Sequence, residues 1–528
     1  MHVLTYIPYG ADGIIVRIEA DIRRGIPGID ISGLAEGAVR EAKERVRAAF
    51  RNSGFQFPQD RVLINLAPAG VKKDGAALDL PIALAIMAAS GHLPPLNDFL
   101  VMGELELSGE IRPVRGVLAA TAAGLKEGAK GFIVPKGNYR EAAILAPSMS
   151  AAPFNLYEAV EVLRHWAEMG SLPPCNIDDV ISNRDDDSDS VGDFSEVQGQ
   201  ERYKRALEIA SAGGHNLLVF GPPGAGKTML ARRLPSIMPR LTKDEAVEVT
   251  RLHSLAGQLK NEASLIDHAP FRSPHHSASM EGLMGGGRTV KPGEISLAHN
   301  GVLFLDEGTE FKKNVLQSLR EPLEDGHVTI SRADGPVRLP ADFQLIIAAN
   351  TCPCGRLGIH SLQHYDNSHQ NFSGKQSCVC TVDEVYRYWR KFGSALLDRT
   401  ELRVGVLPPR MISGISSHEN SANIAARTAR AISIQQMRFK NKTIRRNSRI
   451  PPGMISQFCL LENTALNAFN KATELLTLSG RACHSILKVS RTIADLEGSE
   501  EIKAVHVLEA VEHRRLGDDP YDILSIDQ

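Results

Sequence analysis

The residues best suited to chemistry are the eight at positions 221–228, which read GPPGAGKT. They match the full pattern G-x-x-x-x-G-K-[ST], with an apolar strand-like segment before them and a helical pattern after them. Glycines let the backbone curl until several N–H groups point at a phosphate, and the helix N-terminus adds partial positive charge. A glycine-rich turn without a ligand would not need all eight positions. We therefore expect a nucleotide to be held by Gly221, Pro222, Pro223, Gly224, Ala225, Gly226, Lys227, Thr228 and Met229.

Two of these side chains have separate expected roles. Lys227 would reach the β- and γ-phosphates, and the hydroxyl of Thr228 would bind Mg²⁺. An apolar strand at 301–305 then runs into Asp306 and Glu307. Such a strand end is weak evidence alone but strong evidence after a complete phosphate-binding loop. We expect Asp306 to hold Mg²⁺, directly or through water, and Glu307 to polarise the attacking water.

Four of the seven cysteines form two C-x-C pairs, Cys352 with Cys354 and Cys378 with Cys380. Two such pairs can bind a tetrahedral Zn²⁺ or act as a redox pair. The spacing is tighter than the usual C-x₂-C. Structural zinc and free thiols that hold a loop therefore carry equal weight, and a disulfide is less expected in a reducing compartment.

Five histidines are weighed against the same metal chemistry. His360, His364 and His369 lie between the cysteine pairs and are alternative ligands. His275 and His276 are adjacent in a loop, and such pairs are more often structural than metal-binding. We expect no metal at this second pair.

Two basic features compete as nucleic-acid contacts. Asp334-Gly335 between alternating residues predicts a β-hairpin at 328–339, which carries Arg332 and Arg338. These arginines could contact phosphates or could simply be solvated on an exposed hairpin. The densest basic run, 438–449, has one interleaved aromatic residue and is more typical of a solvated linker.

Bulk composition limits the class of protein. The chain has 528 residues, 43% hydrophobic and 23% charged, which is typical of a globular protein with several domains. Its net charge of −2 gives no general support for a polyanion partner. The N-terminus lacks a signal-peptide pattern, and the longest apolar run, 82–89, is far shorter than the ~18 residues of a membrane span. We expect a cytoplasmic protein without a membrane contact.

The pattern of elements predicts an α/β multidomain chain. Residues 1–170 are expected to form one α/β domain and 171–194 an acidic, serine-rich linker. Residues 195–410 are expected to form a parallel-sheet core with a cysteine-rich insert at 350–382. The remaining residues, 411–528, follow helical patterns at 457–461, 465–478, 482–496 and 504–515 and predict a helical lid.

The N-terminal domain resembles the proteolytic domain of Lon-type proteases, through strings such as GELELSGEIRPVRGVLAATAAG and VPKGNYREA. That family uses a serine–lysine dyad. Ile82 stands at the position matched to the nucleophile and Leu118 at the position matched to the lysine. Neither side chain can attack a carbonyl or move a proton. The resemblance therefore implies an inactive protease fold that serves assembly or partner binding.

The whole chain resembles the YifB/ComM-type magnesium-chelatase-like AAA+ ATPases. The most specific strings are FRSPHHSAS, KPGEISLAHNGVLFLDE, LREPLEDGHVTISRA, ANTCPCG, LLDRTELRV and LSGRACHSILKVSRTIADLEG. The resemblance implies an AAA+ P-loop ATPase core, ATP and Mg²⁺ as cofactors, and a homo-oligomeric, hexameric ring. It also implies DNA binding and branch-migration helicase activity, with the hairpin at 328–339 in the pore.

The same resemblance gives roles to three further residues. Asn350, at the end of an apolar strand at 343–349, matches sensor 1, which orients the attacking water. Arg399 matches the arginine finger that reaches a neighbouring subunit's γ-phosphate. Arg481 matches sensor 2 on the lid of the same subunit. A guanidinium suits the roles of Arg399 and Arg481 because it is always charged and can stabilise the charge that develops on a transferring phosphoryl group. A surface salt bridge is the alternative for each arginine.

Three functions compete on this evidence. The first is a ring-forming ATPase that moves on or remodels DNA. The second is a chelatase-type motor that remodels a protein partner without nucleic acid. The third, an ATP-dependent protease, is disfavoured by Ile82 and Leu118. Departures from the family pattern, such as Gly308-Thr309 after the carboxylate pair, remove no catalytic group.

Overall fold

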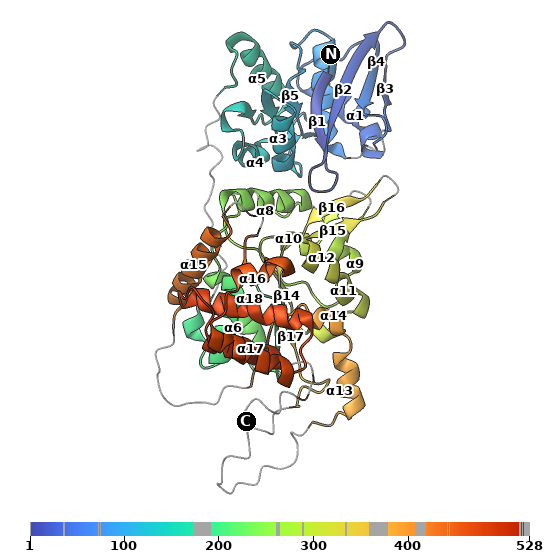
Figure 1. Cartoon of the computed structure of the whole chain (residues 1–528). Helices are drawn as coiled ribbons and strands as arrows, with labels where there is room; N and C mark the ends of the chain where they lie inside the picture. The colour runs from blue at the N-terminus through green and yellow to red at the C-terminus, as the bar shows by residue number, and fades with distance from the viewer. Residues whose placement is uncertain are drawn as a thin grey trace.

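In the computed structural model the chain forms three parts that are visible in Figure 1: an N-terminal domain, a parallel-sheet core and a set of C-terminal helices. The described residues are all of 1–528 except 1, 35–36, 72, 74, 174–191, 260–264, 288–289, 333–334, 358–377, 408–418, 441, 443, 517–518, 520 and 522–528. Most of the predicted acidic linker and the histidines at 360, 364 and 369 lie outside the described residues.

The N-terminal domain is built on a seven-stranded mixed sheet in the order β3-β4-β2-β1-β5-β8-β9. The half around β1 and β2 contains antiparallel pairs, and the half from β1 to β9 is parallel. The strands are β1 (His2–Ile7), β2 (Ile14–Arg23), β3 (Gly28–Ser32), β4 (Arg61–Ala67), β5 (Phe99–Val101), β8 (Gly131–Ile133) and β9 (Ser150–Ala151). A separate small hairpin pairs β6 (Glu104–Leu105) with β7 (Ile111–Arg112).

Five helices accompany this sheet. They are α1 (Gly37–Asn52), α2 (Asp79–Ala89), α3 (Val117–Lys126), α4 (Tyr139–Ala143) and α5 (Leu156–Met169). Helix α2 is buried along ten of its eleven residues, which explains its lack of an amphipathic pattern. Its one carboxylate, Asp79, is paired with Arg45 of α1 at 2.7 Å. The sheet and these helices therefore enclose a buried apolar core.

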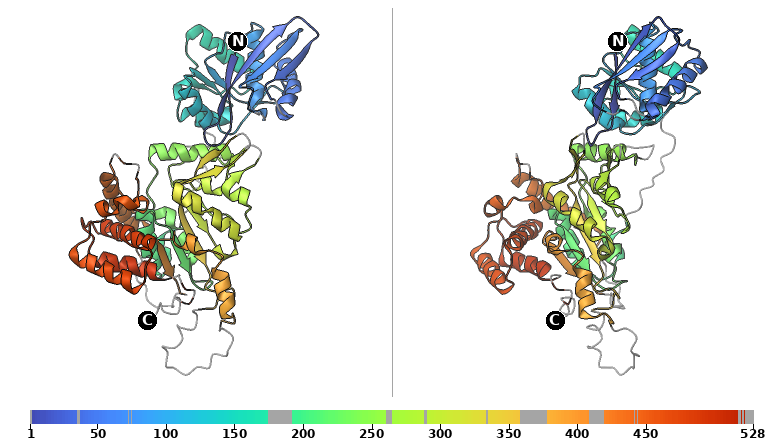
Figure 2. Two further views of the ribbon diagram at one scale, coloured as in Figure 1. Left: turned by 45° about the vertical axis from the view of Figure 1, so that its right-hand side comes forward. Right: turned by 90° about the vertical axis from the view of Figure 1, so that its right-hand side faces the viewer.

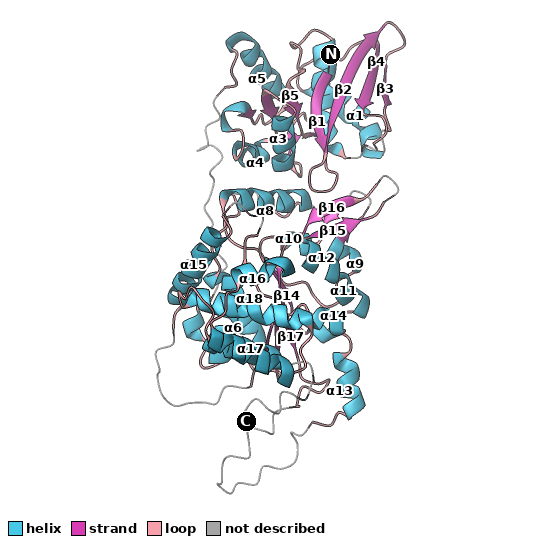
Figure 3. Ribbon diagram, in the orientation of Figure 1, coloured by secondary structure: helices cyan, strands magenta, loops and turns pink. Residues whose placement is uncertain are grey.

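The core sheet of the second part is five-stranded and fully parallel, in the order β11-β14-β17-β10-β18. The three central strands are buried at every residue, as expected for a parallel sheet covered on both faces. Figure 3 shows the strands β14 and β17 enclosed by helices. The strands are β10 (Leu217–Phe220), β11 (Phe271–Arg272), β14 (Val302–Leu305), β17 (Gln344–Ala349) and β18 (Leu402–Gly405).

Helices and two short hairpins surround this sheet. The helices are α6 (Glu201–Gly213), α7 (Lys227–Ala231), α8 (Lys243–Ala256), α9 (Met280–Met284), α10 (Glu294–Leu297), α11 (Lys313–Ser318), α12 (Arg320–Asp325), α13 (Val382–Trp389) and α14 (Ser394–Leu397). The hairpins pair β12 (Gly285–Gly286) with β13 (Lys291–Pro292) and β15 (His327–Ile330) with β16 (Val337–Pro340). The second confirms the predicted hairpin, although residues 333–334 are not described.

One helical segment of the core is divided in two. The pattern at 314–324 predicts a single helix, whereas the chain forms α11 and α12 with a break at Leu319. Pro322 explains the break, because it has no N–H for the carbonyl of Ser318 and its ring crowds that carbonyl.

The C-terminal part is helical, as predicted. Its helices are α15 (Ser421–Arg438), α16 (Ile455–Phe458), α17 (Asn463–Leu475), α18 (Gly480–Leu496) and α19 (Ala504–Arg515). Helix α15 is an addition to the predicted elements. The basic run at 438–449 has structural contacts at both ends, since Arg438 pairs with buried Asp495 and Arg449 pairs with Asp342.

The N-terminal domain packs on helix α8 and on the hairpin β15–β16, as Figures 1 and 2 show. Leu255 of α8 lies in the apolar cluster of the N-terminal domain, and Arg251 of α8 pairs with Asp12 at 2.9 Å. Ala11, in the loop between β1 and β2, shares an apolar cluster with Val337 of the hairpin. In the described part of the chain, no helix is long and apolar enough to cross a membrane.

Candidate active site

The loop at 221–228 connects buried β10 to helix α7, as the sequence predicts. Its shape depends on glycine, as two positions illustrate. A Cβ on Gly221 would lie 2.1 Å from the carbonyl oxygen of Val406, and Gly226 has a φ of 83° at the N-cap of α7. The loop therefore keeps the curled form that presents N–H groups to an anion.

Lys227 is held inside this loop. Its Nζ donates to the carbonyl oxygens of Gly221 at 2.8 Å and Pro222 at 2.9 Å, and to Oδ1 of Asn350 at 3.1 Å. Burial lowers the pKa of Lys227 to about 8, against the opposing effect of the Asp306 and Glu307 carboxylates. The lysine is thus placed close to a polar partner that can share a γ-phosphate with it.

The two carboxylates stand at the end of β14, two strands away from β10 in the sheet. Thr228 Oγ1 donates to Oδ2 of Asp306 at 2.9 Å, so the predicted Mg²⁺ ligands already lie together. Glu307 has a φ of 50°, which is rare for a residue other than glycine and turns the chain sharply after Asp306. Hydroxyl and carboxylate oxygens at this separation fit Mg²⁺, which prefers oxygen ligands.

Asn350 follows β17, the strand between β14 and β10. The carboxyl ends of parallel strands meet at one edge of a sheet, which brings together Lys227, Asp306, Glu307 and Asn350. Behind the loop, the hydroxyl of Tyr203 donates to the carbonyl oxygen of Lys227 at 3.1 Å. The residues predicted to bind phosphate and Mg²⁺ therefore lie together at one edge of the sheet.

Sequence reasoning missed a histidine at this edge. His276 is expected from its loop setting to be structural, but its Nδ1 lies 3.8 Å from Oε2 of Glu307. Its ring packs on His275 with centroids 4.1 Å apart. His276 and Glu307 belong to different segments of the chain, so no local sequence pattern could have signalled the contact.

The two arginines lie at the opposite edge of the same sheet. Arg399 precedes β18, and its carbonyl oxygen accepts from Nδ2 of Asn216, the residue before β10. Strand β10 has four residues and separates this edge from the phosphate-binding loop by about 13 Å. Arg399 therefore stands away from the phosphate-binding loop of the same chain.

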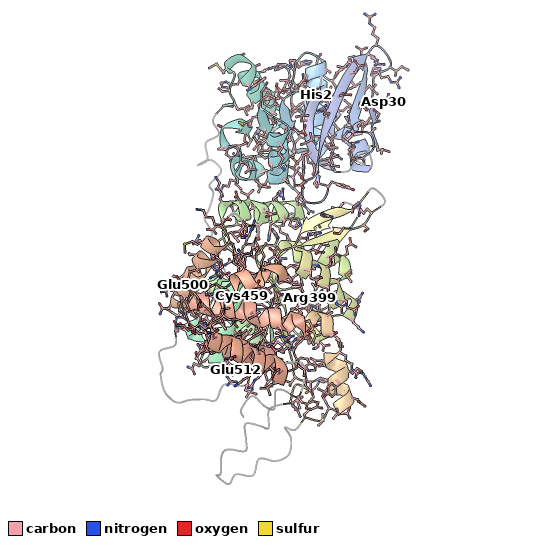
Figure 4. All side chains as sticks on the ribbon, viewed as in Figure 1. His2, Asp30, Arg399, Cys459, Glu500 and Glu512 are labelled. Atoms are coloured by element: carbon pink, nitrogen blue, oxygen red, sulfur yellow. The ribbon has the colours of Figure 1, made fainter. Side chains whose placement is uncertain are left out.

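Arg481 lies beside Arg399, whereas the sensor 2 resemblance implies a place on a lid over the phosphate-binding loop of the same chain. Both guanidinium groups pair with Oε1 of Glu324, at 2.5 Å for Arg399. Figure 4 labels Arg399, which lies near the helix α18 that carries Arg481. One carboxylate cannot neutralise two guanidinium groups, so this pairing leaves an excess of positive charge.

Three further predictions concern the cysteine pairs, the hairpin arginines and the two positions matched to the protease dyad. The four cysteine sulfurs of the C-x-C pairs all lie within 4.8 Å of one another, and the cysteines that the structure describes are free. On the hairpin β15–β16, Arg338 is exposed and Arg332 is half-buried. Ile82 and Leu118 are both buried aliphatic side chains, with no nucleophile or base at either position.

The fold and this edge define a P-loop ATPase of the AAA+ type. Three family models match the chain: "Magnesium chelatase, subunit ChlI" over residues 193–412, "Subunit ChlI of Mg-chelatase" over 18–138, and "Magnesium chelatase, subunit ChlI C-terminal" over 418–514.

Individual relatives show to which family of magnesium-chelatase-like proteins the chain belongs. Competence protein ComM of Haemophilus influenzae is 39% identical over 514 residues, 96% of each chain. The uncharacterized protein YifB of Escherichia coli is 38% identical over 519 residues, 97% of each chain. A Lon protease of Chloroflexus aurantiacus is 25% identical over 186 residues, 34% of this chain and 22% of that protein. The chain belongs to the YifB/ComM family of magnesium-chelatase-like proteins.

Proposed function

We propose that this chain is the subunit of a ring-forming motor that hydrolyses ATP with Mg²⁺ and acts on DNA as a helicase or branch-migration enzyme. The observation that carries the proposal is the separation of the site into two edges. Lys227, Asp306, Glu307 and Asn350 stand at one edge of the sheet, and Arg399 stands at the other. A site divided in this way is complete only when a second subunit supplies the arginine.

A head-to-tail arrangement of subunits would give both edges of each sheet a partner. Each subunit offers its phosphate-binding edge to one neighbour and its arginine edge to the other, and such contacts close into a ring. We propose a hexamer, in which Arg399 and Arg481 both reach the neighbour's nucleotide. Arg399 Nε is buried without a hydrogen-bond partner among the described residues, which fits a side chain that awaits a ligand.

Lys227, Thr228 and Asp306 would hold ATP and Mg²⁺. The ion would neutralise charge on the β- and γ-phosphates. Glu307 would then polarise the attacking water, while Asn350 would orient that water against the γ-phosphate. Four thiolates of the C-x-C pairs would hold a structural Zn²⁺. We place the motor in the cytoplasm.

Two observations support DNA as the substrate. One relative carries the name competence protein, and the hairpin β15–β16 exposes Arg338. The test is ATP hydrolysis with and without forked or four-way-junction DNA across a range of salt concentrations. We expect stimulation that declines as salt rises, because phosphate contacts release counterions. Absence of both binding at low salt and strand displacement would refute the DNA proposal.

A protein substrate is the second candidate. The hairpin packs against the N-terminal domain through Ala11 and Val337, so this face already makes protein contacts. A motor of this kind would hydrolyse ATP without any response to DNA. Hydrolysis that is unchanged by every DNA structure, but stimulated by an unfolded protein substrate, would favour it.

A further inference from the structure

The four-cysteine cluster is joined directly to the catalytic edge. Cys352 follows Asn350 by two positions, and Asn350 accepts a hydrogen bond from Lys227. Cys378 and Cys380 come from the segment that precedes α13. The cluster therefore ties the end of β17 to a distant part of the chain.

The distances between the sulfur atoms match those around a tetrahedrally coordinated metal ion. The Sγ–Sγ separations are 3.4 Å for Cys352–Cys354, 3.7 Å for Cys352–Cys378 and 3.6 Å for Cys354–Cys378. Zn–S bonds of about 2.3 Å in a tetrahedron place the sulfurs about 3.8 Å apart. A disulfide would require about 2.05 Å. The geometry fits a shared cation and not a disulfide.

Backbone N–H groups donate hydrogen bonds to two of these cysteine sulfurs. The N–H of Leu357 donates to Cys352 Sγ at 3.4 Å. The backbone N–H groups of Arg356 and Val379 donate to Cys354 Sγ. Metal-bound ligands are generally oriented by a second set of hydrogen bonds of this type.

The loop around the first cysteine pair is seated on the phosphate-binding loop. Gly355 approaches so closely that a Cβ there would lie 2.8 Å from Cδ of Pro223. On the other side, Trp389 Nε1 donates to the carbonyl oxygen of Thr351 at 2.9 Å. The Trp389 ring also packs edge-to-face on Phe220, with centroids 5.5 Å apart. Movement of the loop would thus disturb the surroundings of Asn350.

We propose that Zn²⁺ bound by Cys352, Cys354, Cys378 and Cys380 fixes this loop against the phosphate-binding loop and thereby positions Asn350. Asn350 is the group that touches the reaction, and the cysteines act through it. Small displacements of such a group are costly, since about 1 Å can lower a rate on the order of 10²-fold. This proposal rests on the proposed ATPase function.

The metal is tested first, independently of activity. Elemental analysis of the purified full chain should find about one zinc per chain, and a mercurial thiol reagent should release it. The Cys354→Ser, Cys378→Ser double variant should lose the zinc, whereas the matched control Cys483→Ser should keep it. Iron in place of zinc, a wild-type chain that neither holds nor takes up zinc, or zinc retained by the double variant would overturn the site.

The positioning role is tested by the response of Trp389. The chain has two tryptophans, so a Trp166→Phe background leaves Trp389 as the only tryptophan, and its emission is excited selectively over that of the tyrosines. Removing zinc should change its emission and lower kcat on the order of 10²-fold, with little change in ATP affinity; restoring zinc should reverse both effects. Equal kcat and emission with and without zinc would overturn the role. Lys227→Ala should keep its zinc but lose hydrolysis, which distinguishes failure of the zinc site from failure of the ATPase proposal.

Discussion

The two edges of the five-stranded sheet differ in how completely each is built within one chain. At the carboxyl edge, Lys227 donates to Asn350, and Thr228 donates to Asp306. At the amino edge, Arg399 and Arg481 share one carboxylate, that of Glu324. The difference supports the proposal that one edge binds the nucleotide and the other completes a site in a neighbouring subunit.

The largest effect is expected at the carboxyl edge. Lys227→Ala should lower ATP hydrolysis by on the order of 10³-fold or more, because the β- and γ-phosphates lose their cation. Steady-state hydrolysis measures it, and Lys471→Ala on the exposed surface of α17 is the matched control. A Lys227→Ala chain that still hydrolysed ATP would remove the catalytic assignment of this edge.

Arg399→Ala should have the next largest effect. We expect kcat to fall on the order of 10³-fold, within the range for arginine fingers, while nucleotide affinity of the isolated subunit changes little. Binding and hydrolysis are measured separately for this reason. Arg399→Lys should not restore the rate, because an ammonium lacks the planar pair of donors. A large loss of affinity in the isolated subunit would mean that Arg399 serves its own nucleotide.

Arg481→Ala should cost less, about 10²-fold in kcat, as expected for loss of one charged donor. The effect should again appear in the assembled protein and not in nucleotide binding by the isolated subunit. If Arg481→Ala weakened binding in the isolated subunit, the lid of the same subunit would close over its own site, contrary to the shared pairing on Glu324.

The carboxyl edge is more predictable from sequence than the amino edge for a physical reason. The loop at 221–228 is one continuous stretch of sequence, and Asp306-Glu307 is another. Each follows a buried apolar strand, so local sequence patterns identify both. Arg481 and Glu324 are 157 positions apart, and only the folded chain shows that they meet.

Elements without a strong local pattern also escape sequence reasoning. Helix α15 is not predicted. The hydrophobic periodicity at 314–324 predicts one helix, whereas the proline in α12 divides this segment into two. The contact of His276 with Glu307 likewise depends on tertiary structure.

The smallest predicted effect is a pH dependence at the carboxyl edge. Burial lowers the pKa of Lys227 to about 8, so the free subunit loses this positive charge as pH rises through that value. ATP affinity should therefore fall about tenfold between about pH 7 and pH 9. Binding of a fluorescent ATP analogue measures it. Affinity that stayed constant over this interval would show that Lys227 remains charged.

The most direct test of a site shared between subunits is a mixing experiment. Lys227→Ala subunits keep the arginine edge, and Arg399→Ala subunits keep the phosphate-binding edge. Each variant alone should be nearly inactive, whereas an equal mixture should recover activity at about a quarter of its subunit boundaries. A mixture that stayed as inactive as the separate variants, although the subunits co-assembled, would contradict the account.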